Sequence, residues 1–75
     1  AETLWTVFPN PSADGVYINS NELLHAKVYT LSGELVLDQF VRGSIPLSGL
    51  EQGIYLLELE NGNAKVHHRL IVNRQ

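Results

Sequence analysis

The stretch LSGLEQGIYLLELE, residues 47–60, decides how this 75-residue chain is expected to fold. Its second half alternates with a period of two, so Tyr55 and the two leucines that follow at alternate positions share one face of a strand. The opposite face combines two glutamates with Ile54 and Leu56. A solvent face that is partly apolar predicts either a central strand or a strand with a contact surface.

The first half of this stretch holds the most specific local signal in the chain. Leu50, Gly53 and Tyr55 have the spacing L-x-x-G-x-Y. This spacing resembles the corner of immunoglobulin-like domains, where a tyrosine near the start of a strand returns its hydroxyl to an upstream backbone group. The alternative is a tyrosine that is simply buried in the core.

Outside this stretch the sequence continues as short alternating segments, with glycine or asparagine about every eight to twelve residues. The expected strands are residues 5–8, 16–19, 24–31, 34–41, 44–47, 54–60 and 64–72. Ser32-Gly33 and Asn61-Gly62 mark two tight hairpins, because glycine adopts a positive φ at little cost. The pattern predicts an all-β protein without helices, a seven-stranded antiparallel immunoglobulin-like β-sandwich.

Two further strands alternate clearly. In the strand 24–31, Leu24, Ala26 and Val28 share one face and His25, Lys27 and Tyr29 the other, and one of these faces is expected to look inward. In the strand 64–72 the face expected to point to the core carries Val66, His68, Leu70 and Val72. The chain has no cysteine, so no disulfide braces this core. Core substitutions should therefore be severe in a domain this small.

Composition sets the broad class. Hydrophobic residues make up 44% of the chain and charged residues 17%, a balance typical of a globular domain. The net charge of -3, with five scattered lysines and arginines, argues against nucleic-acid binding. The length predicts one domain over residues 1–75, with a linker and first strand in 1–8, the sandwich in 9–72 and a tail in 73–75. The chain opens without a secretory signal, and its start reads like a cut from something longer.

No constellation of catalytic or metal-binding residues forms along the chain. His67 and His68 are adjacent on a strand, so their side chains leave opposite faces and cannot hold one metal ion together. Enzymatic activity, a metal and a cofactor are not expected. Trp5, Phe8 and Tyr17 could form an aromatic platform for sugar, but core packing is the stronger interpretation.

The stretch FPNPSADGVYIN, residues 8–19, begins with a stiff polar bend. Pro9 and Pro11 fix their own φ and push Phe8 and Asn10 towards extended conformations. We expect this bend to set the direction in which a preceding segment joins the sandwich. The alternative is that the prolines merely terminate an edge strand.

Four segments, taken in order, resemble the type A C-terminal sorting domain of the bacterial type IX secretion system. They are FPNPSADGVYIN, AKVYTLSGELV, IPLSGLEQGIYLLELE and KVHHRLIV, which together span residues 8–72. By this resemblance the recognition or structural motif residues are Pro9, Asn10, Pro11, Gly15, Gly33, Leu50, Gly53, Tyr55, Lys65 and Arg69. Arg74 is a further candidate for receptor contact.

The resemblance implies a sandwich attached to the C-terminus of a larger exported cargo. After passage into the periplasm, such a domain would direct the cargo through the outer-membrane translocon with the help of a shuttle protein. A cell-surface sortase would then remove the domain, and the cargo would be secreted or joined to surface lipopolysaccharide. The alternative class is a structural or adhesion β-sandwich, either fibronectin type III-like or carbohydrate-binding.

The sequence departs from the family pattern at two places. Thr30 stands where these domains often carry Asp or Asn before the turn. His67-His68-Arg69 has fewer permanent charges than the lysines common in the tail, which predicts recognition that is weaker or more sensitive to pH. An unpaired edge strand is also expected to offer a pairing site to a partner or to a second copy, as an edge-strand dimer.

Overall fold

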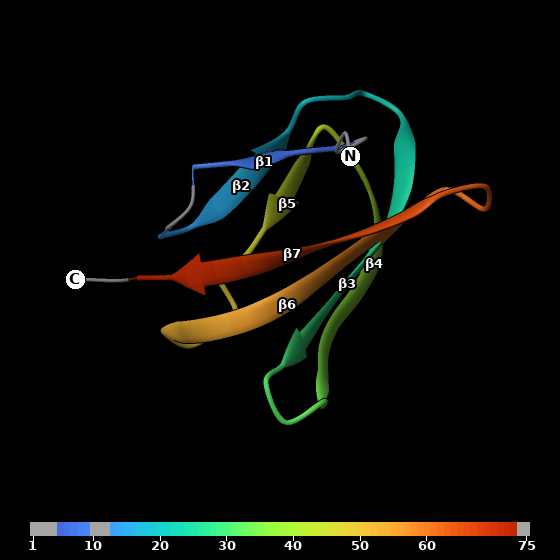
Figure 1. The fold of residues 1–75 in the computed structure, drawn as a ribbon. Helices are drawn as coiled ribbons and strands as arrows, with labels where there is room; N and C mark the ends of the chain where they lie inside the picture. Colours follow the sequence, from blue (N-terminus) through green and yellow to red (C-terminus); the bar gives the residue numbers. More distant parts are fainter. Residues whose placement is uncertain (1–4, 10–12, 74–75) are drawn as a thin grey trace.

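A computed structural model of the chain describes residues 5–9 and 13–73. Within these residues the strands are β1 (Val7–Phe8), β2 (Gly15–Ile18), β3 (Leu23–Thr30), β4 (Leu35–Arg42), β5 (Ser44–Pro46), β6 (Gly53–Glu60) and β7 (Lys65–Val72), drawn in Figure 1. Every expected strand is present, with its ends within two residues of the prediction. In the described part of the chain no helix occurs that could cross a membrane.

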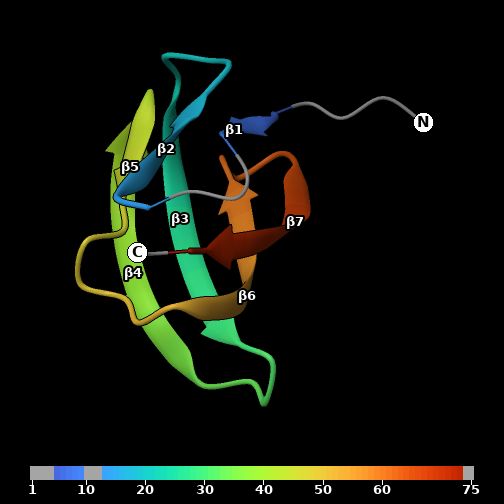
Figure 2. The ribbon, with the colours of Figure 1, turned by 90° about the vertical axis from the view of Figure 1, so that its left-hand side faces the viewer.

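The strands form two antiparallel sheets that face each other as a sandwich (Figures 1 and 2). One sheet has the order β1-β2-β5 and the other the order β4-β3-β6-β7. The chain changes sheets between β4 and β5 at Gly43, which has a φ of 83° and whose carbonyl accepts a hydrogen bond from the Ile18 amide. The second strand pairs with the fifth, the third with the sixth, and the sixth with the seventh, which is the arrangement of immunoglobulin-like sandwiches. The predicted fold class is therefore confirmed.

The core lies between the two sheets and draws on both. Its buried residues are Trp5, Val16, Ile18, Leu24, Ala26, Val28, Val41, Ile45, Leu47, Leu50, Tyr55, Leu57, Leu59, Leu70 and Val72. In β3 the inward side is the one with Leu24, Ala26 and Val28. The inward face predicted for the last strand is confirmed, although His68 and Val66 are only partly buried. β6 lies between β3 and β7, so its prediction as a central strand is also confirmed.

The hairpin between β3 and β4 has a three-residue loop, 31–33, where the sequence suggested two residues. The Thr30 amide donates a hydrogen bond to the Glu34 carbonyl at 2.8 Å and so closes the loop. Gly33 has a φ of 100°, the left-handed conformation that such loops place at their third residue. The Thr30 hydroxyl accepts a hydrogen bond from the Glu34 amide at 3.1 Å. Thr30 thus supplies the turn-closing acceptor that an Asp or Asn side chain also offers.

The hairpin between β6 and β7 is tighter. The Asn61 amide donates to the Ala64 carbonyl at 3.2 Å, which leaves a two-residue loop that begins at Gly62 with a φ of 94°. The side-chain oxygen of Asn61 accepts from the amides of Asn63 and Ala64, each at 2.9 Å. A glycine at the first loop position and an asparagine before it are the residues this turn requires.

Candidate recognition surface

The L-x-x-G-x-Y segment forms a closed corner between β5 and β6. The Tyr55 hydroxyl donates to the Glu51 carbonyl at 2.6 Å, which confirms the predicted return to an upstream backbone group. The Tyr55 side chain is also buried, with 8% exposed, so the alternative of a core tyrosine holds as well. Leu50 is buried beside it and donates its amide to the Leu47 carbonyl at 3.0 Å. Gly53 is the first residue of β6.

The corner lies next to the hairpin that carries Gly33. Thr30 at the end of β3 stands opposite Tyr55 in the register of the sheet. A shallow depression between the two segments is lined by Thr30, Glu34, Leu50 and Tyr55, among others. Two motif segments that are far apart in the sequence therefore meet at one end of the sandwich.

Gly15 is the first residue of β2 in the three-stranded sheet, and Pro9 lies next to that sheet. Gly15 pairs with Pro46, and a Cβ at Gly15 would lie 2.7 Å from the Ile45 carbonyl oxygen, closer than the strands allow. Glycine is therefore required here by the close approach of β5. Pro9 follows β1 through a cis peptide bond with Phe8 and lines a depression with Gly15 and Pro46. Asn10 and Pro11 lie outside the described residues.

The three N-terminal aromatic residues have different environments. Trp5 is in the core, with 4% exposed. Phe8 and Tyr17 are 50% and 60% exposed, and their rings form a tilted pair with centroids 6.0 Å apart. Core packing was therefore the correct interpretation for Trp5 and the wrong one for Phe8 and Tyr17, which point outward from β1 and β2.

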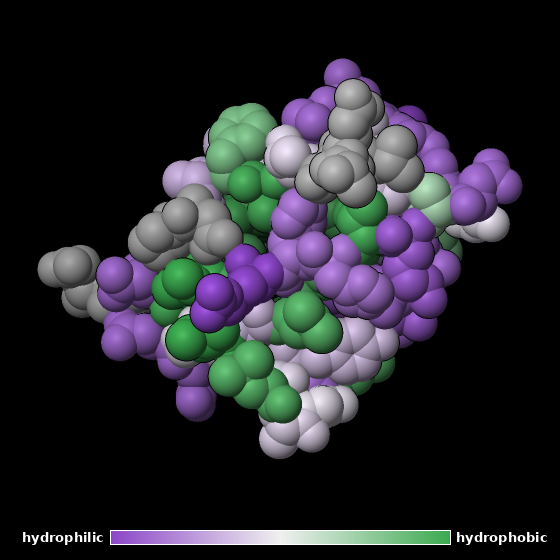
Figure 3. Space-filling model, in the orientation of Figure 1, coloured by the Kyte–Doolittle hydropathy of each residue, from purple (hydrophilic) through white to green (hydrophobic). Residues whose placement is uncertain are grey.

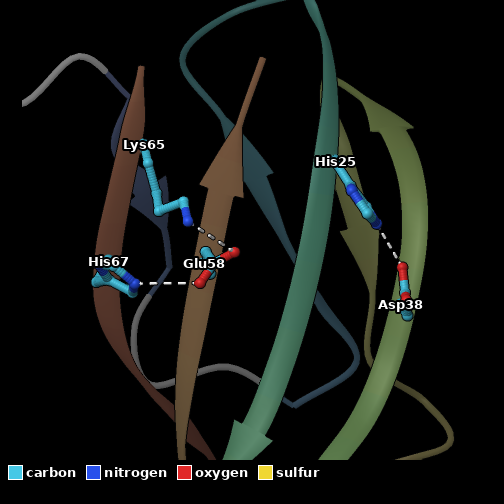
Figure 4. Close-up of polar contacts among 5 residues, drawn as sticks. All are labelled: His25, Asp38, Glu58, Lys65 and His67. Atoms are coloured by element: carbon cyan, nitrogen blue, oxygen red, sulfur yellow. Dashed lines mark hydrogen bonds and ion pairs between the residues drawn. The ribbon is translucent and has the colours of Figure 1, made fainter. Parts of the chain in front are cut away.

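The tail residues Lys65 and Arg69 lie on the outer face of β7, with His67 between them. Lys65 Nζ lies 3.9 Å from one carboxylate oxygen of Glu58 on β6, and His67 Nε2 lies 3.2 Å from the other (Figure 4). Arg69 stands opposite Leu56 in the register. The Glu58 side chain is only 12% exposed, in keeping with the place of β6 between β3 and β7. Arg74 is outside the described residues.

The other half of this outer face carries a second polar group that sequence reasoning missed. His25 Nε2 and Asp38 Oδ1 are 2.5 Å apart across β3 and β4, and the His25 ring stacks on Phe40 with centroids 4.6 Å apart. Figure 4 shows both His–carboxylate pairs on the same sheet. Among residues 5–9 and 13–73 no three ligand-type side chains gather as a metal site, and His67 and His68 point to opposite faces as predicted.

Exposed apolar residues lie beside these polar groups, nearer the start of β6. Ile54 is 44% exposed and Leu56 40%. In Figure 3 apolar residues gather towards the lower left, over the start of β6 and the end of β7, and polar residues surround them. The outer face of the four-stranded sheet therefore combines charged groups with exposed apolar side chains.

Comparison with known proteins identifies the family. Residues 6–73 match the family described as "Secretion system C-terminal sorting domain". The chain is also similar to a protein named Beta-agarase D from Zobellia galactanivorans, with 31% identity over 67 residues. That match covers 88% of this chain and 14% of the relative, so the chain spans a small part of the relative's length. The chain therefore belongs to the family of secretion system C-terminal sorting domains, the type IX family that its sequence resembles.

Proposed function

We propose that this chain directs an N-terminally attached cargo protein across the outer membrane through the type IX secretion system and is then removed by a cell-surface sortase. Family membership indicates a C-terminal sorting signal of that system. The observation that carries the proposal is the extent of the match, since residues 6–73 include all seven described strands. We assign residues 1–75 to one sorting domain.

Attachment to a cargo is supported by the relative, of which the matched part is only 14%. The partners would be the outer-membrane translocon, the shuttle protein and the sortase, and the route would pass through the periplasm to the outer membrane, the cell surface or the medium. No catalytic step falls to the domain itself, and we expect no enzymatic activity from it.

Within the proposal, the motif residues have two kinds of role. Five of them act by maintaining the fold, because they form turns, the corner before β6 and the close approach of two strands. They are Gly15, Gly33, Leu50, Gly53 and Tyr55. The proposed receptor contacts are Lys65 and Arg69 on the outer face of β7. The proposed determinants of the direction in which the cargo joins the domain are Pro9, Asn10 and Pro11. Exposed residues on a rigid sheet are the ones a partner can contact directly.

The test is a fusion of the chain to the C-terminus of a periplasmic reporter, expressed in a bacterium that has the type IX system. Delivery of the reporter to the surface or medium, with loss of the domain, is expected. A matched variant with Lys65→Gln and Arg69→Gln should remain folded, with a urea midpoint close to that of the wild type, and should lower delivery. Reporter that stays in the periplasm with a folded wild-type domain would contradict the proposal.

The exposed pair Phe8 and Tyr17 favours a second candidate, a carbohydrate-binding module. Exposed aromatic rings can stack on the apolar face of a sugar ring. Binding of oligosaccharides by the isolated chain, abolished by Tyr17→Ala, together with retention of the reporter, would support this candidate over the first.

A further inference from the structure

The segment that leads into the domain is fastened to its last strand. His68 Nε2 lies 2.6 Å from the carbonyl oxygen of Trp5, although the two residues are 63 positions apart. A carbonyl oxygen can only accept a hydrogen bond, so Nε2 of the imidazole carries the proton and donates it. The Trp5 side chain is seated in the core with 4% exposed. Trp5 is therefore held through both its backbone and its side chain.

The residues that follow are held by the neighbouring sheet. The Thr6 amide donates to the side-chain oxygen of Asn19 at 2.9 Å, and the Asn19 amide donates to the Thr6 carbonyl at 3.2 Å. β1 pairs with β2 alone, in the three-stranded sheet, whereas β7 belongs to the other sheet. In Figure 1, β1 and β7 run in the same direction across the molecule. The bond from His68 thus ties the incoming segment to the opposite layer.

We infer that Trp5 marks a processing boundary, the position from which the folded domain resists cleavage by a protease. We also infer that the hydrogen bond from His68 makes this resistance depend on β7 being packed in the sandwich. A protease must open folded structure before it can cut it, and the cost of that local opening sets the rate. The chain from Trp5 to Phe8 is held by core burial and by hydrogen bonds, so a cut that separates a preceding segment from the folded domain falls before Trp5. Loss of the bond from His68 loosens Trp5 and moves the cut into the domain.

For the sortase, this boundary would confine the cut to the chain before Trp5, and that extension rests on the proposed function. The boundary itself is a property of the folded chain and needs no secretion machinery. A failure of the boundary in vitro is therefore distinguishable from a failure of the chain to direct export.

The experiment uses the 75-residue chain with a reporter fused before Ala1, treated with a broad-specificity protease under native conditions. Mass spectrometry gives the first residue of the resistant fragment. For the wild type, fragments that begin at or before Trp5 are expected. In His68→Asn the shorter side chain cannot reach the Trp5 carbonyl. Fragments that begin within residues 6–9 should therefore form about five to ten times faster than in the wild type, the factor that corresponds to the loss of one hydrogen bond. His68→Gln, whose amide reaches further, should restore most of the protection.

His67→Asn is the matched control, since His67 points outward on the same strand, and it should behave as the wild type. Trp5 is the single tryptophan, so quenching of its emission by acrylamide reports the same opening independently. Wild-type fragments that begin beyond Trp5, or equal cutting of His68→Asn and His67→Asn, would overturn the inference. So would a His68→Asn chain that loses its whole fold, because the inference requires local opening without global unfolding.

Discussion

The hydroxyl of Tyr55 donates a hydrogen bond to the carbonyl oxygen of Glu51, 2.6 Å away, and so fixes the chain where it crosses from β5 to β6. Tyr55→Phe keeps the buried ring and removes only this bond. The free energy of unfolding should fall by about 0.5 to 1.5 kcal/mol, the net contribution of a typical intramolecular hydrogen bond. Urea unfolding followed by Trp5 fluorescence measures the change. Tyr17→Phe, in an exposed ring, should alter stability by less than about 0.5 kcal/mol.

The two faces of β6 should respond differently to truncation. Leu57 is fully buried, whereas Leu56, its neighbour on the outer face, is 40% exposed. Leu57→Ala should cost about 2 to 5 kcal/mol, because it removes buried apolar atoms and leaves a cavity. Leu56→Ala should cost much less. Similar urea midpoints for the two variants would contradict the assignment of the faces.

Gly15 and Gly49 offer a matched pair of glycines. A Cβ at Gly15 would meet the Ile45 carbonyl oxygen at 2.7 Å, whereas a Cβ at Gly49 has nothing within 4 Å. Gly15→Ala should therefore separate β2 from β5 and lower stability by about 1 to 3 kcal/mol, the usual cost of overpacking. Gly49→Ala should be nearly neutral or slightly stabilising. Thermal unfolding of both variants decides this, and a neutral Gly15→Ala would show that the sheet adapts.

The ion pair of Lys65 with Glu58 should contribute little. The two charged atoms are 3.9 Å apart, and the Lys65 side chain is 52% exposed. A double-mutant cycle with Lys65→Gln and Glu58→Gln should give a coupling free energy of about 0.2 to 1 kcal/mol, which decreases as salt is added. A larger coupling that is insensitive to salt would mean that the pair is better shielded from solvent than its exposure indicates.

The N-terminal prolines should affect export more than stability. Pro9→Ala combined with Pro11→Ala removes the restriction on the backbone of the bend and of the residues before each proline. We expect lower delivery of a fused reporter with a urea midpoint close to that of the wild type. Unchanged secretion and processing of the double variant would refute a role for this bend in sorting. A collapse of the urea midpoint would instead favour its role as the end of an edge strand.

The strands and the corner could be predicted because local sequence determines them. The alternation around Leu57 specifies a face, and glycines at Gly33 and Gly62 specify where the chain turns. Tyr55 could be placed because its partner, Glu51, is only four residues away.

The side-chain pairs across the sheet could not be predicted, because they depend on register. Counting outward from the closing pair Thr30 and Glu34 would place His25 opposite Gln39. An irregularity between Val28 and Tyr29 shifts the register by one residue and brings Phe40 opposite His25 instead. Asp38 comes within reach of His25 through the same shift.

In β2 the alternation of Val16, Tyr17 and Ile18 already places Tyr17 outward, but the exposure of Phe8 escaped the sequence pattern. β1 is only two residues long, and so short a strand has too few alternating positions to specify its inward side. The contact of His68 with Trp5 joins residues 63 positions apart, and no local signal links them.

The pairing of β3 with β6 and the bond between Trp5 and His68 have a consequence for synthesis. Both require the final third of the chain, so the native sandwich cannot form on the ribosome until nearly the whole chain has emerged. Any polypeptide that precedes this chain is therefore synthesised before the sandwich can close. The order of translation therefore makes the closed sandwich a sign that synthesis has proceeded through β7.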